Sequence, residues 1–289
     1  MEYEARIRQI DPTLVVNTWR ANDEGLVNDV VVVNEDTIFR FPKNEYGIRV
    51  LDNELRVMDL IRSHIELAMP KPFYQNKDAI AYPYLSGMPL SRETVADLEE
   101  TDRQAVADQL GRFLRTMHTF PLTDALRTEI AATPAPCRYT DWIDIRRQAE
   151  EHVRPLLLPH QQDWMEGLFD DMLRDPATFD YVPSLIHGDL APYHILFDAP
   201  THRLTGIIDF GVAGLGDPAI DIGLLMCVYG ERFVTRLGRV YPEIDRLLPR
   251  SRFYAQASQL QWVLVGIKTG QSFWFAAHLG GARDIGPTL

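Results

Sequence analysis

Residues 184–198, SLIHGDLAPYHILFD, place two histidines and an aspartate inside a run of Leu, Ile and Phe. The apolar residues on both sides predict that this segment lies near the protein interior. Burying His187, Asp189 and His194 costs several kcal/mol unless each is paired, hydrogen-bonded or bound to a metal. The fold must therefore supply partners for all three, which makes them candidates for a functional site.

The spacing of a second motif narrows the possibilities. Asp209-Phe210-Gly211 begins twenty positions after Asp189, and two strand-like runs, 194–197 and 204–210, lie between them. Protein kinases have the catalytic loop H-R-D-L-x-x-x-N, then a strand, then D-F-G. The order and spacing agree here, with Gly188 for Arg and His194 for Asn. Two carboxylates so placed suit phosphoryl transfer, because one orients the attacking hydroxyl and the other holds Mg²⁺ against the phosphates.

Each motif alone has a plainer explanation. His-Gly-Asp by itself fits a turn with a capping aspartate, Asp-Phe-Gly is a common tripeptide, and a buried histidine is usually a satisfied core residue. Their occurrence together, in kinase order, favours the functional interpretation.

The chain divides into two regions of different character. Residues 29–33 and 37–41 are β-branched and aromatic runs joined by a hairpin-like turn, helical spacing follows over 47–65, and 79–85 is a further strand. After Pro89, amphipathic helices are predicted over 101–120, with Thr101 or Asp102 as N-cap, and then over 141–153 and 160–173. We expect an α+β, bilobal, protein-kinase-like fold, with a β-rich N-lobe (1–87) and a larger, mainly helical C-lobe (88–289).

Composition limits the partners and the compartment. The 289 residues carry a formal net charge of −12, which disfavours nucleic acid and anionic membranes and weakly favours cationic ligands. No apolar run has the length of a membrane span, the first residues lack a signal-peptide hydrophobic region, and the two cysteines lack metal-site spacing. We expect a cytoplasmic monomer that binds small molecules.

The stretch LIHGDLAPYHILFD…LTGIIDFGVAGLGDPAIDIGLL resembles the aminoglycoside phosphotransferase family, which shares the protein-kinase fold. Within that family the chain looks closest to 2''-aminoglycoside and macrolide phosphotransferases. The resemblance is strongest over 185–225 and extends to EGLVNDVVVVNEDTIFRFPK in the first lobe.

This resemblance implies roles for individual residues. Asp189 is the catalytic base or hydroxyl-orienting carboxylate, and Asp209 is the main Mg²⁺ ligand. His194 occupies the position of a metal-binding asparagine; because Mg²⁺ prefers oxygen, it reaches either the metal or a metal-bound water or phosphate. His187 supports the loop, and Asp217 and Asp221 either brace it or cap the following helix.

The N-lobe needs a cation for the nucleotide phosphates, paired with a helix carboxylate. Glu54 is the candidate carboxylate. The cation is Arg40, within the strand, or Lys43, just after it; relatives commonly have lysine at the position of Arg40. Lys43 is slightly favoured because an ammonium is the usual phosphate point charge, although a surface role for it stays open.

The strand 79–85 leads into the hinge, where backbone groups near Tyr84 and Leu85 are expected to meet the base of the nucleotide. Tyr82 falls at the position where related enzymes with a bulky tyrosine prefer GTP, so we hypothesise GTP use, with ATP as the alternative donor. The chain has no full glycine-rich loop before this point and offers only Gly25.

The acceptor is the least determined component. The 2''-aminoglycoside enzymes carry acids in the helix after D-P-x-x-D, where this chain has Met226 and Cys227. From Phe210 onward it has six acidic and eight basic residues. Aromatic residues are frequent there instead: Tyr229, Phe233, Trp262, Phe273, Trp274 and Phe275, most of them expected in the core.

Three functions follow from this pattern. The favoured one is transfer of the γ-phosphate to a hydroxyl of an aminoglycoside, with acids of the middle helices (Asp141, Asp144, Glu150 and Glu151) available to bind its amines. The second is a kinase for a macrolide or another small hydroxyl compound. The third is a catalytically silent nucleotide-binding module, for which the departures at Arg40 and His194 leave room.

Overall fold

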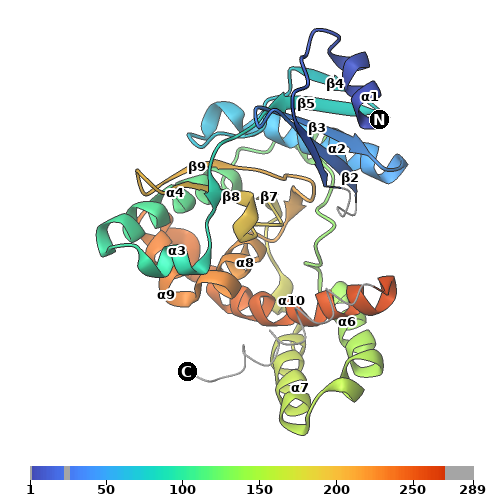
Figure 1. Cartoon of the computed structure of the whole chain (residues 1–289). Helices are drawn as coiled ribbons and strands as arrows, with labels where there is room; N and C mark the ends of the chain where they lie inside the picture. The colour runs from blue at the N-terminus through green and yellow to red at the C-terminus, as the bar shows by residue number, and fades with distance from the viewer. Residues whose placement is uncertain (1, 23–26, 271–289) are drawn as a thin grey trace.

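The computed structural model describes residues 2–22 and 27–270. The N-lobe is a five-stranded antiparallel sheet with the strand order β1-β2-β3-β5-β4, seen at the top of Figure 1. The strands are β1 (Trp19–Asn22), β2 (Asn28–Val33), β3 (Thr37–Pro42), β4 (Tyr74–Asn76) and β5 (Ala79–Pro83). Helix α1 (Glu2–Ile10) covers one face and α2 (Glu45–Ile61) the other.

The two-residue period of the strands divides the side chains between these helices. Val31, Val33, Phe39 and Phe41 form a buried cluster with Ile7 of α1. The alternate side chains, which include Val32, Ile38 and Ile80, join the core that contains Leu51, Leu55 and Met58 of α2. The same alternation places Arg40 on the α2 side of the sheet.

The turn between β2 and β3 is the hairpin that the sequence predicts. Asn34 and Glu35 both have left-handed backbone angles, with φ of 52° and 56°. Consecutive positive φ values match the twist of a tight hairpin, and Val33 pairs with Thr37 directly beside the turn.

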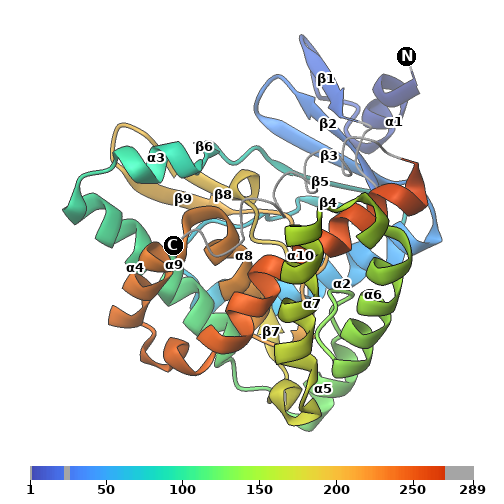
Figure 2. The ribbon, with the colours of Figure 1, turned by 90° about the horizontal axis from the view of Figure 1, so that it is seen from below.

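The C-lobe is mostly helical. Its α-helices are α3 (Arg92–Asp97), α4 (Glu100–His118), α5 (Asp124–Glu129), α6 (Tyr139–His152), α7 (Pro159–Leu173), α8 (Ala219–Tyr229), α9 (Glu231–Val234) and α10 (Leu248–Thr269). Short 3₁₀ turns are η1 (Arg62–His64), which still belongs to the N-lobe, η2 (Arg154–Leu156), η3 (Pro176–Phe179), η4 (Pro192–His194), η5 (Thr235–Arg239) and η6 (Pro242–Arg246). Figure 2 shows α10 running between α8–α9 on one side and α6–α7 on the other.

The N-cap position predicted for α4 is wrong by two or three residues. Glu99 is the N-cap residue, and Thr101 and Asp102 lie inside the first turn. Glu100 and Asp102 still favour this end of the helix, because carboxylates there interact well with the helix dipole.

Two small sheets carry the motifs. Strand β7 (Ser184–Ile186) pairs with β10 (Gly214–Gly216), and β8 (Ile195–Asp198) lies between β6 (Met88–Pro89) and β9 (Arg203–Ile207). The loop after β7 holds the first motif, and the loop after β9 holds the second. These short pairings therefore bring both motifs to one end of the C-lobe, facing the N-lobe.

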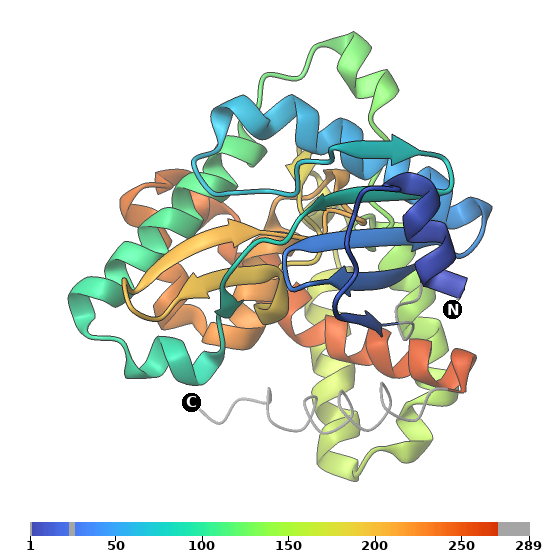
Figure 3. The same cartoon turned by 45° about the horizontal axis from the view of Figure 1, so that its top comes forward.

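The lobes meet along β9, which lies below and to one side of the N-lobe sheet (Figures 1 and 3). The Ala68 amide donates to Thr205 O at 3.2 Å, and the Ile207 amide donates to Ala68 O at 2.9 Å. The Thr205 hydroxyl donates to Ser86 O at 2.8 Å. A Cβ on Gly206 would lie 2.7 Å from Ala68 O, so only glycine allows this approach. The α+β, bilobal architecture predicted from the sequence is confirmed.

Candidate active site

A cavity of about 450 Å³ lies between the two lobes. Strands of the N-lobe form its upper wall, and the two motif loops form its lower wall. Its lining residues are Val27, Asn28, Val30, Ile38, Arg40, Tyr46, Val50, Tyr82, Tyr84, Leu85, Asp189, Tyr193, His194, Ile208, Asp209, Gly211, Val212 and Trp262. Cavities of this size and mixed character are typical of small-molecule sites.

Both ring nitrogens of the buried His187 have hydrogen-bond partners. Its Nε2 lies 3.1 Å from Ile208 O, and the amide of Asp189 donates to its Nδ1 at 3.2 Å. Because a carbonyl only accepts, Nε2 carries the proton, and the ring connects the two motif loops. Burial lowers the pKa of His187 to about 4, so the ring is neutral at physiological pH.

Asp221 holds the loop from below. Its carboxylate accepts the backbone N–H groups of His187 and Gly188 at 2.9 and 2.7 Å, and it lies 3.0 Å from His118 Nε2. Burial alone would raise the pKa of Asp221, but the His118 contact and these N–H groups lower it below its ordinary value. Gly188 has a φ of +79°, a conformation that glycine adopts without strain. The expected bracing role of Asp221 agrees with these contacts.

Asp217 has a different set of partners. It pairs with Arg250 of α10 at 2.6 Å, accepts the Tyr254 hydroxyl at 2.9 Å and accepts the Ala219 amide at 3.0 Å. The last contact caps the start of α8, which is the alternative that the sequence left open. Asp217 therefore ties α8 to α10, and none of these three contacts reaches the motif loop.

The two motif aspartates face the same cavity, with His194 between them. His194 Nε2 lies 3.3 Å from Asp209 Oδ2, and its Nδ1 lies 3.6 Å from Asp189 Oδ2. The Nδ1 atom also lies 2.7 Å from the Asp189 carbonyl oxygen, which can only accept, so Nδ1 carries a proton. A second proton on Nε2 lets the charged ring donate a hydrogen bond to Asp209 Oδ2 as well.

Electrostatics distinguish these three groups. Partial burial raises the pKa of Asp189. Burial opposes the charged form of His194 as well, but the hydrogen bond with Asp209 and the charges of both aspartates raise its pKa. Burial also opposes ionisation of Asp209, yet His194 and Arg40 hold its pKa well below the usual range. Asp209 is thus the most strongly ionised carboxylate at the cavity.

The backbone of Asp209 is strained. Its φ is +62°, in the left-handed region that non-glycine residues seldom occupy. Strain of this kind costs about 1–3 kcal/mol and is concentrated at functional sites, where surrounding contacts hold it. The amide of Gly211 donates to Asp209 Oδ1 at 3.3 Å, which fixes the carboxylate at the cavity edge.

The donor atoms here fit a Mg²⁺ ion that is shared with phosphates. Asp209 is 46% exposed and ionised, and His194 Nε2, 3.3 Å from its carboxylate, becomes a second donor atom once it gives up its proton. Within residues 2–22 and 27–270, no group of three or more His, Cys, Asp or Glu side chains forms a complete metal site. Mg²⁺ does not require one, because it is usually bound through one or two carboxylates, waters and substrate phosphates.

Arg40, rather than the slightly favoured Lys43, pairs with Glu54. Arg40 Nη1 lies 2.7 Å from Glu54 Oε1 and its Nη2 lies 4.0 Å from Asp209 Oδ1. Burial opposes the charge on Arg40, but these carboxylates raise its pKa further above its usual value. Lys43 lies 3.4 Å from Asp29 and is not among the cavity residues. The reason is geometric: β3 ends at Pro42, so Lys43 falls outside the alternation that directs Arg40 inward.

The hinge residues Tyr82, Tyr84 and Leu85 all line the cavity. Burial raises the pKa of Tyr82 to about 12, so its hydroxyl is neutral. The amide of Tyr84 already donates to Asp36 O at 2.7 Å, and Pro83 has no amide hydrogen. Backbone contacts to a base at this hinge must therefore use carbonyl groups or the amide of Leu85.

The cavity lining contains more aromatic than acidic residues. Trp262 of α10 and Tyr193 line the cavity, whereas Tyr229 and Phe233 are buried in the core, as expected. Phe273, Trp274 and Phe275, like Gly25, lie outside the described residues. Each of the four acids that the sequence suggested for binding amines lies on α6 and pairs with an arginine: Asp141 with Arg138, Asp144 and Glu151 with Arg147, and Glu150 with Arg154. These acids do not line the cavity, so they provide no cationic acceptor site there.

Sequence reasoning missed several cavity and support residues. Val30 and Ile38 could have been found from the alternation that also orients Arg40, because all three side chains lie on one face of the N-lobe sheet. Asn28 lies on the same face of the sheet. Tyr46 and Val50 carry no local signal, since their roles depend on how the lobes pack, and Trp262 was visible in the sequence only as one of the aromatic residues after Phe210. His118 carries none either, because its partner Asp221 lies more than 100 positions away in the chain.

The described helices include none that is both long and apolar enough to cross a lipid bilayer.

Comparisons with known proteins agree with this geometry. An uncharacterised Bacillus subtilis protein, YcbJ, is 27% identical over 246 residues, covering 77% of this chain and 74% of YcbJ. A structure of the GDP and kanamycin complex of APH(2")-IIia has a TM-score of 0.85 at 25% identity and covers 98% of both chains. Macrolide 2'-phosphotransferase type I shares the fold, with a TM-score of 0.72 at 20% identity over 96% of each chain. The model of the phosphotransferase enzyme family matches residues 18–254, and the chain belongs to that family.

Proposed function

We propose that this chain transfers the γ-phosphoryl group of a nucleoside triphosphate to a hydroxyl of an aminoglycoside. The observation that carries the proposal is the convergence of Asp189 and Asp209 on one cavity, with His194 within 3.6 Å of both carboxylates. Membership of the phosphotransferase family and the similarity to a GDP- and kanamycin-bound enzyme support it.

In this mechanism Asp189 accepts a hydrogen bond from the acceptor hydroxyl and aims its oxygen at the γ-phosphorus. As the new P–O bond forms, the bond from the γ-phosphorus to the β–γ bridging oxygen breaks, the nucleoside diphosphate leaves with that electron pair, and the hydroxyl proton passes to the Asp189 carboxylate. The raised pKa of Asp189 favours this transfer, because a more basic carboxylate holds the proton better. The Asp189 carbonyl accepts from His194 Nδ1–H, so the loop and the histidine orient each other.

Asp209 and His194 Nε2 are the proposed ligands of Mg²⁺. When bound, the ion neutralises negative charge on the phosphates. Arg40, held by Glu54, contributes a second positive charge from the N-lobe side of the cavity. Tyr82, Tyr84 and Leu85 are the proposed base-binding residues. Tyr82 occupies space at the inner end of this wall, and we propose that it favours GTP over ATP.

A macrolide or another less polar alcohol is the second candidate acceptor. Trp262 and Tyr193 line the cavity, while Asp189 and Asp209 are its only acidic lining residues within the described part of the chain. That surface is less suited to a polycation than a carboxylate-rich one. A silent nucleotide-binding module is disfavoured, because both motif carboxylates are present and face the cavity.

Release of nucleoside diphosphate across a panel of aminoglycosides and macrolides tests the function. GTP and ATP are supplied at equal concentration with Mg²⁺, and mass spectrometry looks for a phosphorylated product. We expect turnover with an aminoglycoside, faster with GTP. Turnover with macrolides alone would select the second candidate, and a clear preference for ATP would contradict the role given to Tyr82.

Nucleotide binding without turnover on any acceptor, by protein whose folding has been verified, would favour the silent module.

A further inference from the structure

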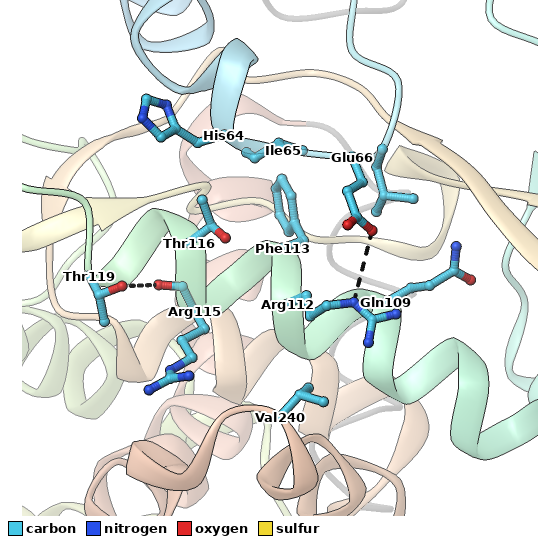
Figure 4. Close-up of a pocket in the computed structure, with 11 residues that line it drawn as sticks. His64, Ile65, Glu66, Gln109, Arg112, Phe113, Arg115, Thr116, Thr119 and Val240 are labelled. Atoms are coloured by element: carbon cyan, nitrogen blue, oxygen red, sulfur yellow. Dashed lines mark hydrogen bonds and ion pairs between the residues drawn. The ribbon is translucent and has the colours of Figure 1, made fainter.

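A second cavity, of about 300 Å³, lies on α4 and is separate from the active site (Figure 4). We call it the α4 cavity. Residues 64–67, which follow α2, form one wall, the stretch of α4 from Gln109 onward forms the other, and Val240 closes one end. It shares no lining residue with the active-site cavity. The site therefore lies where the end of an N-lobe helix meets the C-lobe.

The base of the α4 cavity is apolar. Phe113 and Leu67 are buried, and Figure 4 shows Phe113 pointing from α4 toward the Ile65–Glu66 segment. Val240 adds a further apolar surface at the end of the cavity. An aromatic or aliphatic group placed against these side chains would leave water, which is the main source of affinity in small-molecule sites.

The rim is cationic, although the chain as a whole is acidic. Arg112 and Arg115, three positions apart on α4, lie on the same side of the helix. Arg112 Nε is 4.0 Å from Glu66 Oε2, and that glutamate is 87% exposed, so the pairing is weak. Arg115 has a closer partner, Glu243, at 3.0 Å. Arg112 is thus available to a competing anion, which it can bind through two parallel hydrogen bonds.

We propose that the α4 cavity is a second ligand site, for a small molecule with an aromatic or apolar body and one anionic group. The body rests on Phe113 and Leu67, and the anion meets Arg112. The volume suits a body of about two fused rings.

The contacts of this cavity also point to coupling with the active site. The Phe113 ring centroid lies 6.4 Å from that of Phe210 and 6.5 Å from that of His187, so one lining side chain packs on both motifs. Val240 precedes Tyr241, whose hydroxyl is 2.9 Å from His118 Nδ1, and His118 contacts Asp221. His64, at the other wall, closes the 3₁₀ turn that extends α2, the helix of Glu54. A ligand here therefore restrains the elements that position Asp189, Asp209 and Arg40.

Equilibrium dialysis with 2-naphthalenesulfonate tests binding, with the uncharged 2-naphthalenesulfonamide as matched probe. We expect one saturable site for the sulfonate and about tenfold weaker binding of the sulfonamide. Arg112→Ala should weaken sulfonate binding about tenfold, and Thr116→Trp, which fills the cavity, should abolish it. Arg174→Ala is the control, because it removes an exposed, ion-paired arginine at the C-cap of α7 that is outside the cavity.

Hydrogen–deuterium exchange with the sulfonate tests location and coupling without nucleotide. We expect slower exchange in residues 64–67 and α4, and also in the loop 187–194. Absence of saturable binding, or binding unchanged in both Arg112→Ala and Thr116→Trp, would overturn the site. Unchanged exchange in 187–194 at full occupancy would overturn the coupling. Melting temperatures of the variants verify that each is folded.

Discussion

Two pairs of aspartates lie within the same part of the C-lobe, yet they differ in what surrounds them. Asp217 and Asp221 are fully buried, and Arg250, Tyr254, His118 and backbone N–H groups satisfy them. Asp189 and Asp209 face the cavity, with 36% and 46% of their side chains exposed. A carboxylate whose hydrogen-bonding capacity is used holds a fold together, while one with free capacity can bind something else. The number of partners, rather than residue type, distinguishes the two roles.

Replacing Asp189 by Asn should have the largest effect on turnover. The amide keeps the shape but cannot take the hydroxyl proton, so we expect turnover to fall by about 10³-fold. The melting temperature should stay equal or rise, because a partly buried charge is removed. Steady-state kinetics and calorimetry measure both quantities. A variant with near-normal turnover would remove Asp189 from the catalytic role.

Asp221→Ala sharpens the contrast, because its main effect should be on stability. The change leaves two buried backbone N–H groups and His118 without their acceptor. We expect a loss of about 3 kcal/mol in the free energy of unfolding, and a melting temperature lower by about 6–12 °C. Thermal unfolding followed by circular dichroism measures it. A loss of turnover with unchanged stability would place Asp221 with the cavity pair instead.

Arg40→Gln and Lys43→Gln form a matched pair for the N-lobe cation. Arg40 faces the cavity and Lys43 contacts Asp29, so we expect nucleotide affinity to fall by about tenfold or more in the first and by less than twofold in the second. Titration with GDP and Mg²⁺ followed calorimetrically gives both values. The opposite order would restore the choice of Lys43 that sequence reasoning made.

His194→Asn should have the smallest effect. Asparagine offers a side-chain oxygen to the metal and is the residue in the kinase motif. We expect turnover within about threefold of the unmodified chain and a lower Mg²⁺ concentration for half-maximal rate, because oxygen suits this ion better than nitrogen. Magnesium titrations of both proteins provide the comparison. A large loss of turnover would mean that His194 has a task beyond metal binding.

The sequence was sufficient for the architecture and for the motif residues, because these depend on local patterns. The β-branched and aromatic runs of β2 and β3 and the fixed spacing of Asp189, His194 and Asp209 are legible in one dimension. The sequence did not predict contacts whose two partners are far apart in the chain. The choice between Arg40 and Lys43 depends on which face of β3 meets α2, and the pairing of the helix acids 141–151 with arginines depends on side-chain positions that the sequence does not fix. The N-cap of α4 was predicted at Thr101 or Asp102 because these residue types are favoured caps, whereas the true N-cap is Glu99.

The pairing of Ala68 and Ser86 with β9 has a mechanical consequence. A Cβ at position 206 would force Ala68 away from β9, so the N-lobe would have to tilt against the C-lobe. Because Arg40 belongs to the N-lobe and Asp209 to the C-lobe, we expect such a tilt to change the distance between these two charges, while Asp221 keeps the catalytic loop in place.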